Sequence, residues 1–344
     1  METSDWTAVR RVVPELMDVL QQRLRILQRV HLLGPIGRRA LAQAMQQSER
    51  TLRAELDLLR QQGLLLSSAA GVSLSDEGST LLGELEAVAA AAAGRFDLAR
   101  TLSQMLHIQN VFVVEGDSDT EPWVADQLGL QAGQHLHTVL RDGDIVAVTG
   151  GTTVAALARN MIARQDYRNL QVVPARGGVG ETVEYQANTI ASTLAEKLGG
   201  TSIMLHVPDR LSPGAVEQLL TDPYVQERLP IIRSSTVVVH GIGDAMAMAR
   251  RRRVSEEELS ILIARGAKAE AFGYYFDEHG EVAYSMKTIG LRLSDIGHVR
   301  EVVAVAGGAQ KANAIAAAAK AYRIDTLVTD EGAARRLVQH QHNV

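Results

Sequence analysis

The sequence predicts an α/β protein, in which an N-terminal winged helix-turn-helix precedes a C-terminal domain with a doubly wound, mostly parallel sheet. Helical periodicity, broken by turn residues and followed by one short hairpin pattern, fills the first part of the chain. From about residue 110 onward, short apolar strands alternate with helical stretches, which is typical of a parallel sheet with helices on both faces. A length of 344 residues, 46% of them hydrophobic, allows two domains, which we predict over 1–93 and 94–344.

The composition excludes several classes of protein. The chain has no cysteine, which excludes disulfides, thiolate zinc sites and iron–sulfur clusters. Its first residues carry acids where a signal peptide has bases, and its longest apolar run, Ala87–Ala93, is far too short to span a membrane. The spacing of His, Asp and Glu suggests no metal site. We therefore expect a cytoplasmic protein with no metal, no cofactor and no membrane partner.

The N-terminal elements follow from periodicity and turn residues. A helix is predicted over 12–33, with apolar residues near one face at Leu16, Val19, Leu20, Leu24, Leu27 and Val30. Gly34-Pro35 breaks it, and a short helix over about 38–45 follows. Ser48 is a natural N-cap for a second helix over 48–61. Two short strands, 64–66 and 72–74, and a helix over 76–93 complete the order of a winged helix-turn-helix.

This domain is a candidate DNA-binding domain. Residues 23–60 hold eight arginines against three acids, an excess of five positive charges in a chain whose net charge is −5. A helix-turn-helix places the start of its second helix in the major groove. If Leu52, Leu56 and Leu59 face the core, the side chains around that start point outward. The candidate DNA contacts are Arg38, Ser48, Glu49, Arg50, Thr51 and Arg53. The alternative is a structural helical bundle with solvated charged faces.

The second domain alternates strands and helices after an Ala-rich connection, Ala87–Gly94, which is either a connector or an interface helix. Strands are predicted over 111–114, 145–148, 170–173, 202–207, 236–239, 302–305 and 326–329. The intervening helices include 153–163, 182–198, 255–265 and 312–322.

Three glycine-rich strand ends carry the groups that bind phosphate. Gly150-Gly151-Thr152-Thr153 runs from a strand directly into a helix, so backbone amides and hydroxyls meet at a helix N-terminus. Gly307-Gly308 repeats this plan and adds Lys311. Arg176-Gly177-Gly178 ends a third strand. Neither Gly-Gly loop fits the Walker A or the dinucleotide pattern. Together the three loops predict a small polyanionic ligand, such as a sugar with more than one phosphate.

Other polar residues follow the predicted strands. Asp244, Gln186 and Glu270 are candidates for sugar hydroxyls, although each taken singly is better explained as a cap or turn residue. Arg250–Arg253 is either a solvated helix end or a segment that closes over a phosphate. His240 follows an apolar strand and is expected to be a core or capping histidine.

Five segments resemble the SorC/DeoR-like class of bacterial transcriptional regulators, and among them the repressors of central glycolytic genes. The segments are AVTGGTTVAALA, VVPARGGVGETVEYQANTIASTLAEKLGG, VVVHGIGDAMAMARRR, KAEAFGYYFD and VAVAGGAQKANAIAAA. The resemblance implies a sugar-phosphate-binding domain related to phosphosugar isomerases and deaminases, and repression relieved by fructose 1,6-bisphosphate. It implies effector contacts at Gly151, Thr152, Thr153, Arg176, Gly177, Gly178, Gln186, Arg251, Glu270 and Lys311.

Our primary hypothesis is a ligand-gated repressor with no catalysis of its own, which binds double-stranded operator DNA and a sugar phosphate. One alternative is a sugar-phosphate isomerase or deaminase with a helical appendage, whose base would have to be Asp244, Glu270 or His240. Another is a regulator of the same class that senses a different sugar phosphate. Since helix-turn-helix proteins read two half-sites, we expect a dimer or tetramer.

Overall fold

The computed structural model describes residues 12–45, 47–92, 94–164, 167–178, 182–209 and 211–341. The chain forms two compact units, Met1–Asp97 and Leu98–Val344. Each has its own hydrophobic core. Within the described ranges, no helix has the length and apolar character that crossing a membrane requires.

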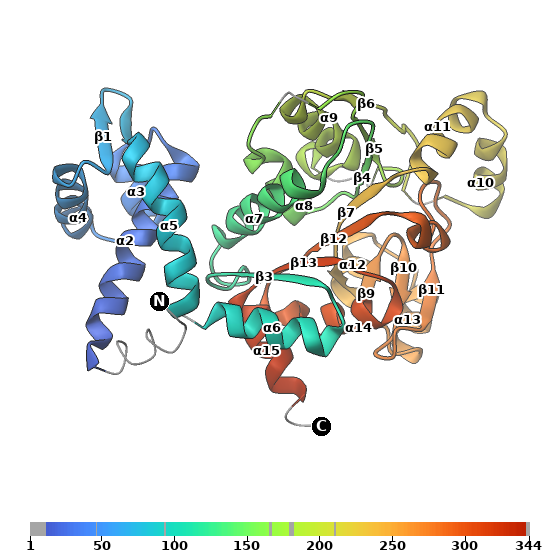
Figure 1. Cartoon of the computed structure of the whole chain (residues 1–344). Helices are drawn as coiled ribbons and strands as arrows, with labels where there is room; N and C mark the ends of the chain where they lie inside the picture. Colours follow the sequence, from blue (N-terminus) through green and yellow to red (C-terminus); the bar gives the residue numbers. More distant parts are fainter. Residues whose placement is uncertain are drawn as a thin grey trace. The chain divides into compact units, whose positions relative to one another are not determined.

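The first unit is a winged helix-turn-helix (Figure 1), as predicted. Its elements are α2 (Pro14–Leu33), α3 (Arg38–Ala44), α4 (Glu49–Gln61), β1 (Leu65–Ser68), β2 (Gly71–Leu74) and α5 (Asp76–Ala92). Strands β1 and β2 form an antiparallel hairpin, and Ile36 adds a bridge to Val72. Gly71 has a φ of +132°, and a Cβ there would collide with the backbone of Ile36, so this close approach requires glycine.

The core of this unit consists mostly of leucines, with at least one from each of the four helices. Leu52, Leu56 and Leu59 of α4 are buried, as their helical spacing predicts. In α2 the predicted apolar face is only partly buried. Leu24, Leu27 and Val30 are inside, whereas Leu16 and Val19 are exposed.

The second unit is built on a seven-stranded sheet in which every neighbouring pair is parallel. The strand order is β3-β13-β12-β7-β4-β5-β6. The strands are β3 (Asn110–Val114), β4 (Ile145–Val148), β5 (Gln171–Pro174), β6 (Thr201–Ser202), β7 (Val237–Gly241), β12 (Glu301–Val305) and β13 (Thr326–Asp330). After β4 the chain winds outward to β5 and β6, and after β7 it winds the other way. The topological switch point, where such sheets bind ligands, therefore lies between β4 and β7.

Helices cover both faces of this sheet. On β4, the side chains of Val146 and Val148 pack with α7, α8 and α9, whereas Ala147 faces the opposite core, which includes α14 and α15. The helices of this part of the chain are α6 (Arg95–Leu106), α7 (Val124–Val139), α8 (Thr152–Asn160), α9 (Ala187–Leu198), α10 (Pro213–Leu220), α11 (Pro223–Arg233), α12 (Ala245–Arg251), α13 (Glu256–Ala264), α14 (Ala312–Ala321) and α15 (Glu331–Gln341). Short 3-10 turns span Val183–Tyr185, Leu293–His298 and Ala309–Lys311.

The structure also contains a four-stranded antiparallel sheet that the sequence did not predict. Its order is β11-β10-β9-β8, from β8 (Gly243–Asp244), β9 (Ala269–Ala271), β10 (Tyr274–Phe276) and β11 (Val282–Ser285). Two other predictions were too long. The strand over 202–207 is only the two residues of β6, and the helix over 182–198 starts at Ala187 after a 3-10 turn.

Candidate functional site

The predicted DNA-contacting side chains lie at the exposed start of α4 and on α3. Ser48 caps α4, because its Oγ accepts from the backbone N–H of Thr51 at 3.1 Å. Arg38, Ser48, Glu49, Arg50, Thr51 and Arg53 are all exposed. The start of the helix is therefore available to a partner in the way a recognition helix requires.

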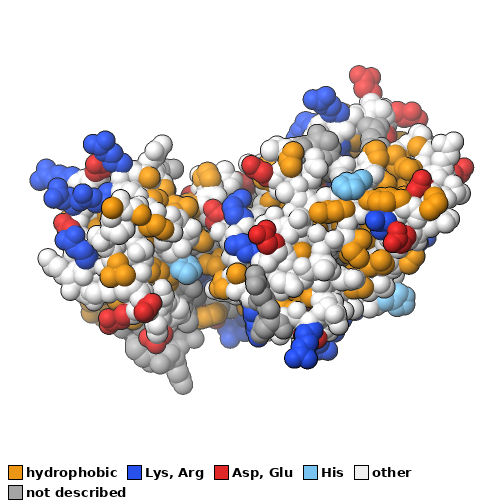
Figure 2. Space-filling view, turned by 90° about the horizontal axis from the view of Figure 1, so that it is seen from above, with side chains coloured by type: hydrophobic (Ala, Val, Ile, Leu, Met, Phe, Trp, Pro, Cys, Tyr) orange, Lys and Arg blue, Asp and Glu red, His pale blue; other side chains and the backbone are white. Residues whose placement is uncertain are grey.

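The charge of this surface is positive. Figure 2 shows basic side chains, here all arginine, gathered on the N-terminal unit. The exposed arginines of α3 and α4 are Arg38, Arg39, Arg50, Arg53 and Arg60. Glu49 pairs with Arg39 at 3.2 Å, and Asp57 lies 3.1 Å from Arg60 and 3.9 Å from Arg53. Such exposed pairs are weak, so the arginines can exchange them for phosphates.

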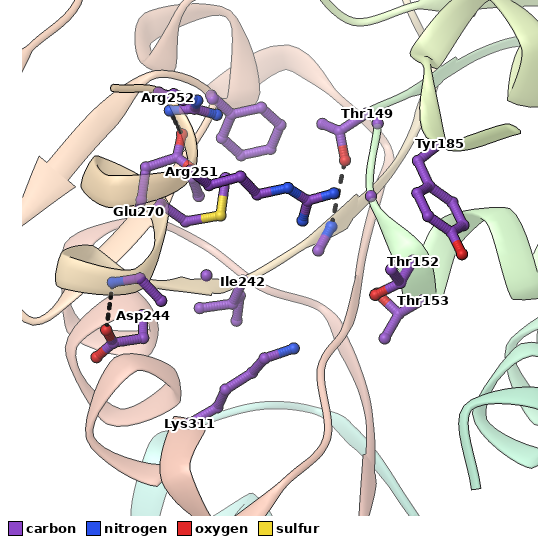
Figure 3. Close-up of a pocket in the computed structure, with 18 of the residues that line it drawn as sticks. Thr149, Thr152, Thr153, Tyr185, Ile242, Asp244, Arg251, Arg252, Glu270 and Lys311 are labelled. Atoms are coloured by element: carbon purple, nitrogen blue, oxygen red, sulfur yellow. Dashed lines mark hydrogen bonds and ion pairs between the residues drawn. The ribbon is translucent and has the colours of Figure 1, made fainter. Parts of the chain in front are cut away.

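In the second unit, a cavity of about 400 Å³ opens at the carboxyl ends of the central strands (Figure 3). Its walls come from the loops after β4, β5, β7 and β12, which surround the switch point between β4 and β7. The lining residues that matter below are Asp119, Thr149, Gly151, Thr152, Thr153, Arg176, Gly177, Tyr185, Gln186, Asp244, Arg251, Arg252, Glu270, Gln310 and Lys311.

This cavity brings together side chains from segments far apart in the sequence. Of the predicted effector contacts, all but Gly178 line it. Gly178 lies one residue beyond the wall, where its N–H donates to Val207 O. Tyr185 and Asp119 line the cavity without having been predicted, and Arg252 lines it as a member of the arginine run Arg250–Arg253. No local pattern marked Tyr185 or Asp119, because they reach the cavity from separate segments.

The first Gly-Gly loop leaves the start of α8 without a side-chain cap. The Gly151 N–H is already used, donating to Tyr185 O at 2.9 Å. The Thr153 hydroxyl donates to Val305 O at 3.0 Å, so its single proton is not available to a ligand. The backbone amides of the first turn of α8 and the exposed Thr152 side chain are what this loop presents to an anion.

The second Gly-Gly loop differs from the prediction. Its amides donate to carboxylates of the chain itself: Gly308 N–H to Asp330 at 2.7 Å, Ala309 N–H to Asp117 at 3.2 Å and Gln310 N–H to Asp119 at 2.8 Å. The prediction that this loop holds a phosphate through these amides is therefore wrong, because all three already donate to carboxylates. From this loop, the side chains of Gln310 and Lys311 line the cavity.

Arg176 and Glu270 belong to a buried group of four charges, which we call the charge quartet: Arg176, Asp209, Arg252 and Glu270. Arg252 Nη1 lies 2.9 Å from Glu270 Oε1 and its Nε 3.5 Å from Asp209 Oδ2. Arg176 pairs with Asp209 and lies 3.5 Å from Glu270. The side chains are 4–6% exposed, and the quartet has no net charge.

The quartet fixes the charge states of its members. Burial alone would raise the pKa of Glu270, but Arg252 and Arg176 outweigh it and hold that pKa below its ordinary value. Burial also disfavours the Arg252 cation, yet Glu270 and Asp209 raise its pKa. Glu270 is thus a carboxylate held by two guanidiniums, and its pKa is lowered. A general base that works near neutral pH needs a raised pKa instead.

Two cations extend toward the first turn of α8. Figure 3 shows the side chains of Arg251 and Lys311 converging on the space in front of Thr152 and Thr153. Burial lowers the pKa of Lys311, an effect that Asp119 and Asp330 partly offset. Of the four consecutive arginines, Arg250, Arg251 and Arg252 line the cavity, and Arg252 is held in the charge quartet.

The two other candidate bases have structural roles. Asp244 caps α12 by accepting from Ala247 N–H at 2.8 Å. His240 is fully buried against Phe272 and Tyr322, and its Nδ1 lies 3.1 Å from Gly241 O. Burial lowers the pKa of His240 to about 4, which keeps the ring neutral. Among the described residues, no group of three or more His, Asp or Glu is arranged to hold a metal ion.

Comparison with known proteins agrees with both units. Residues 19–89 match the model of the CggR N-terminal DNA binding domain, and residues 91–339 match that of a sugar-binding domain. A solved SorC family transcriptional regulator from Enterococcus faecalis is 42% identical with a TM-score of 0.66, covering 70% of this chain and 99% of that one.

Two relatives are similar over nearly their whole length. The central glycolytic genes regulator of Bacillus subtilis is 42% identical over 97% of this chain and 98% of its own. That of Priestia megaterium is 43% identical over 96% and 97%. Both are named as regulators, which confirms the prediction of a regulator over that of an isomerase or deaminase. The chain belongs to the family of central glycolytic genes regulators, SorC-like proteins with an N-terminal DNA-binding domain and a C-terminal sugar-binding domain.

Proposed function

We propose that the chain is a transcriptional repressor of central glycolytic genes, which binds double-stranded operator DNA and is released from it by a sugar phosphate. The DNA contacts are proposed at Arg38, at Arg50 and Arg53, and at the polar residues Ser48, Glu49 and Thr51. The proposed effector is fructose 1,6-bisphosphate, bound in the cavity of the second unit.

The cavity in front of α8 is the observation that supports a phosphorylated effector. An uncapped helix start attracts an anion through its amides and its dipole. Arg251 and Lys311 add two positive charges at the same end. A volume of about 400 Å³ lies within the range of small-molecule sites. Gln186 and Thr152 supply neutral polar groups that suit sugar hydroxyls or phosphate oxygens.

The direct test is binding of the chain to DNA from upstream of its own gene, followed by fluorescence anisotropy. We expect fructose 1,6-bisphosphate to release the DNA at a lower concentration than fructose 6-phosphate or inorganic phosphate. Calorimetry on the chain alone gives the affinities directly. Equal affinity for the mono- and bisphosphate would rule out a second phosphate contact, and release by a different sugar phosphate alone would assign another effector.

The proposal also covers the oligomeric state of the chain and the cellular compartment in which it acts. Since operators of helix-turn-helix proteins have two half-sites, we propose that the chain binds DNA as a dimer or tetramer. Chromosomal DNA and phosphorylated sugars meet in the bacterial cytoplasm, where we propose that it acts. Sedimentation of the chain with and without operator DNA tests the assembly.

A further inference from the structure

Asp119 lies in the loop between β3 and α7 and lines the effector cavity. This loop is fastened to the Gly307–Lys311 segment, nearly two hundred residues away in the sequence. Gln310 N–H donates to Asp119 Oδ2 at 2.8 Å, and Ala309 N–H donates to Asp117 Oδ1 at 3.2 Å. Asp117 also accepts from the N–H of Asp119 at 3.0 Å, which ties the two acids together.

The contact between the two loops is tight. Gly308 has a φ of +99°, and a Cβ at that position would overlap the Asp119 carboxylate. A Cβ at Gly307 would overlap Asp330 in the same way. Glycine is therefore required here to let carboxylates approach the backbone, which is the role that the sequence had suggested for phosphate.

The cavity consequently has two chemically different walls. At the start of α8, the amides have no side-chain cap, and the side chains of Arg251 and Lys311 extend toward them. At the Gly308–Lys311 turn, the amides are donated to carboxylates, and Asp119 presents a negative group near enough to the Lys311 ammonium to favour its charged form. Asp119 Oδ2 accepts from Gln310, while within the described residues its Oδ1 receives no hydrogen bond. A carboxylate oxygen of this kind accepts from a hydroxyl and repels a phosphate.

We propose that Asp119 determines ligand specificity: its carboxylate accepts a hydrogen bond from a hydroxyl of the bound sugar phosphate and keeps phosphate groups away from the backbone of residues 308–310. The phosphate is thereby directed to α8. This inference rests on the proposed sugar-phosphate effector, and it adds a reason why a polyol phosphate is preferred to phosphate alone.

The test compares Asp119→Asn and Asp119→Ala with Asp117→Asn by titration calorimetry. Asp117 is the matched control, because it loses the same charge from the same loop and also accepts from the turn, but does not line the cavity. The probes are fructose 1,6-bisphosphate, fructose 6-phosphate and inorganic phosphate, measured at one ionic strength. Thermal unfolding without ligand checks that each variant folds.

For both Asp119 variants we expect the affinity for the sugar phosphates to fall about tenfold, because a hydrogen bond to a charged acceptor is lost. The affinity for inorganic phosphate should stay the same or rise, because repulsion is removed. Asp117→Asn should leave the ratio of the affinities for fructose 6-phosphate and inorganic phosphate unchanged.

The inference is overturned if the Asp119 variants change the affinity for sugar phosphate and for inorganic phosphate by the same factor, or change neither. It is also overturned if Asp117→Asn shifts the ratio as much as Asp119→Asn does. If the parent chain binds no phosphorylated probe at all, the proposed effector fails first, and the role of Asp119 falls with it.

Discussion

The Thr153 hydroxyl donates to the carbonyl oxygen of Val305 at 3.0 Å, joining the first turn of α8 to the end of β12. Both residues are buried. This hydrogen bond fixes the start of α8 against the sheet at the point where the cavity of the second unit opens. Thr152, one residue earlier, is exposed and lines the same cavity. Two adjacent threonines therefore have different tasks.

Substituting each threonine by valine should separate these tasks. Thr153→Val leaves Val305 O without its donor, so we expect the free energy of unfolding to fall by about 1–3 kcal/mol. Its effector affinity should change little, since the hydroxyl does not donate to the ligand. Thr152→Val should weaken effector binding about tenfold with little change in stability, because a ligand contact is removed from an exposed position. Urea unfolding and calorimetry on the same samples measure both quantities, and a reversed pattern would contradict the assignment.

Arg50→Ala and Arg53→Ala should weaken operator binding without affecting the effector cavity. If one of them contacts a guanine edge, its loss costs about 1–3 kcal/mol and relaxes specificity at one base pair. Arg60→Ala is the control, because Arg60 is exposed on the same helix but lies at its far end. Anisotropy titrations in matched salt measure the effect. Operator binding as tight as that of the parent in both variants would refute the assignment of α4 as the recognition helix.

Lys311→Ala should give a repressor that still binds operator but needs more effector for release. The ammonium group extends toward the proposed phosphate position in front of α8. A charge-assisted contact is worth roughly 1.5–3 kcal/mol, so the effector concentration for half-release should rise tenfold or more. Release at the parent's effector concentration would remove Lys311 from the site.

The lowered pKa of Lys311 predicts a pH dependence of effector binding. A bound phosphate favours the ammonium form and raises this pKa, so the complex takes up protons. Affinity should be highest at pH values below the lowered pKa of the empty site and should fall as pH rises through it. Above about pH 7 the phosphate is already a dianion and does not contribute to this change. Lys311→Arg should flatten the profile, since arginine stays charged. An equally steep profile in that variant would show that another group titrates.

His240 predicts a loss of stability in acid. Burial lowers its pKa from the ordinary 6.5 to about 4, so the unfolded chain takes up a proton more readily than the folded chain. The stabilisation from the neutral ring is fully present above pH 6.5 and is lost as pH falls from 6.5 through 4. Its size is about 3 kcal/mol, from the shift in pKa. Urea unfolding of the parent and of His240→Phe at pH 7.5 and 4.5 should show a smaller drop in the variant, and equal drops would exclude His240 as the cause.

Much of the fold could be predicted because residues that are close in the sequence specify its helices and strands. The helix α4 is specified by its Ser48 cap and its leucine spacing, and both appear in the structure. The parallel strands are short apolar runs, which alternation with helices identifies. The antiparallel sheet was missed because β8 has two residues and β9 and β10 have three each, so they have no readable period.

The site was predictable where glycine-rich loops end strands, and unpredictable where distant groups meet. Gly307-Gly308 did mark a close approach, but its partners are Asp117, Asp119 and Asp330. Sequence spacing contains no information about such partners. Within the arginine run, all side chains are chemically alike. Both Arg251 and Arg252 line the cavity, and only the direction of each residue at the end of α12 turns Arg251 toward α8 and places Arg252 in the charge quartet.

The pairing of β3 with β13 has a consequence for the order in which the two units fold during synthesis. Asn110 at the start of β3 is in register with Thr326 of β13, so this strand pairs in the sheet with a strand that lies more than two hundred residues later in the chain. Contacts of the first unit join residues that are close in the sequence, and such contacts form quickly. On a ribosome the DNA-binding unit can therefore fold while the sheet of the second unit is still incomplete. We expect nascent chains truncated before β13 to contain a protease-resistant first unit and a protease-sensitive second one.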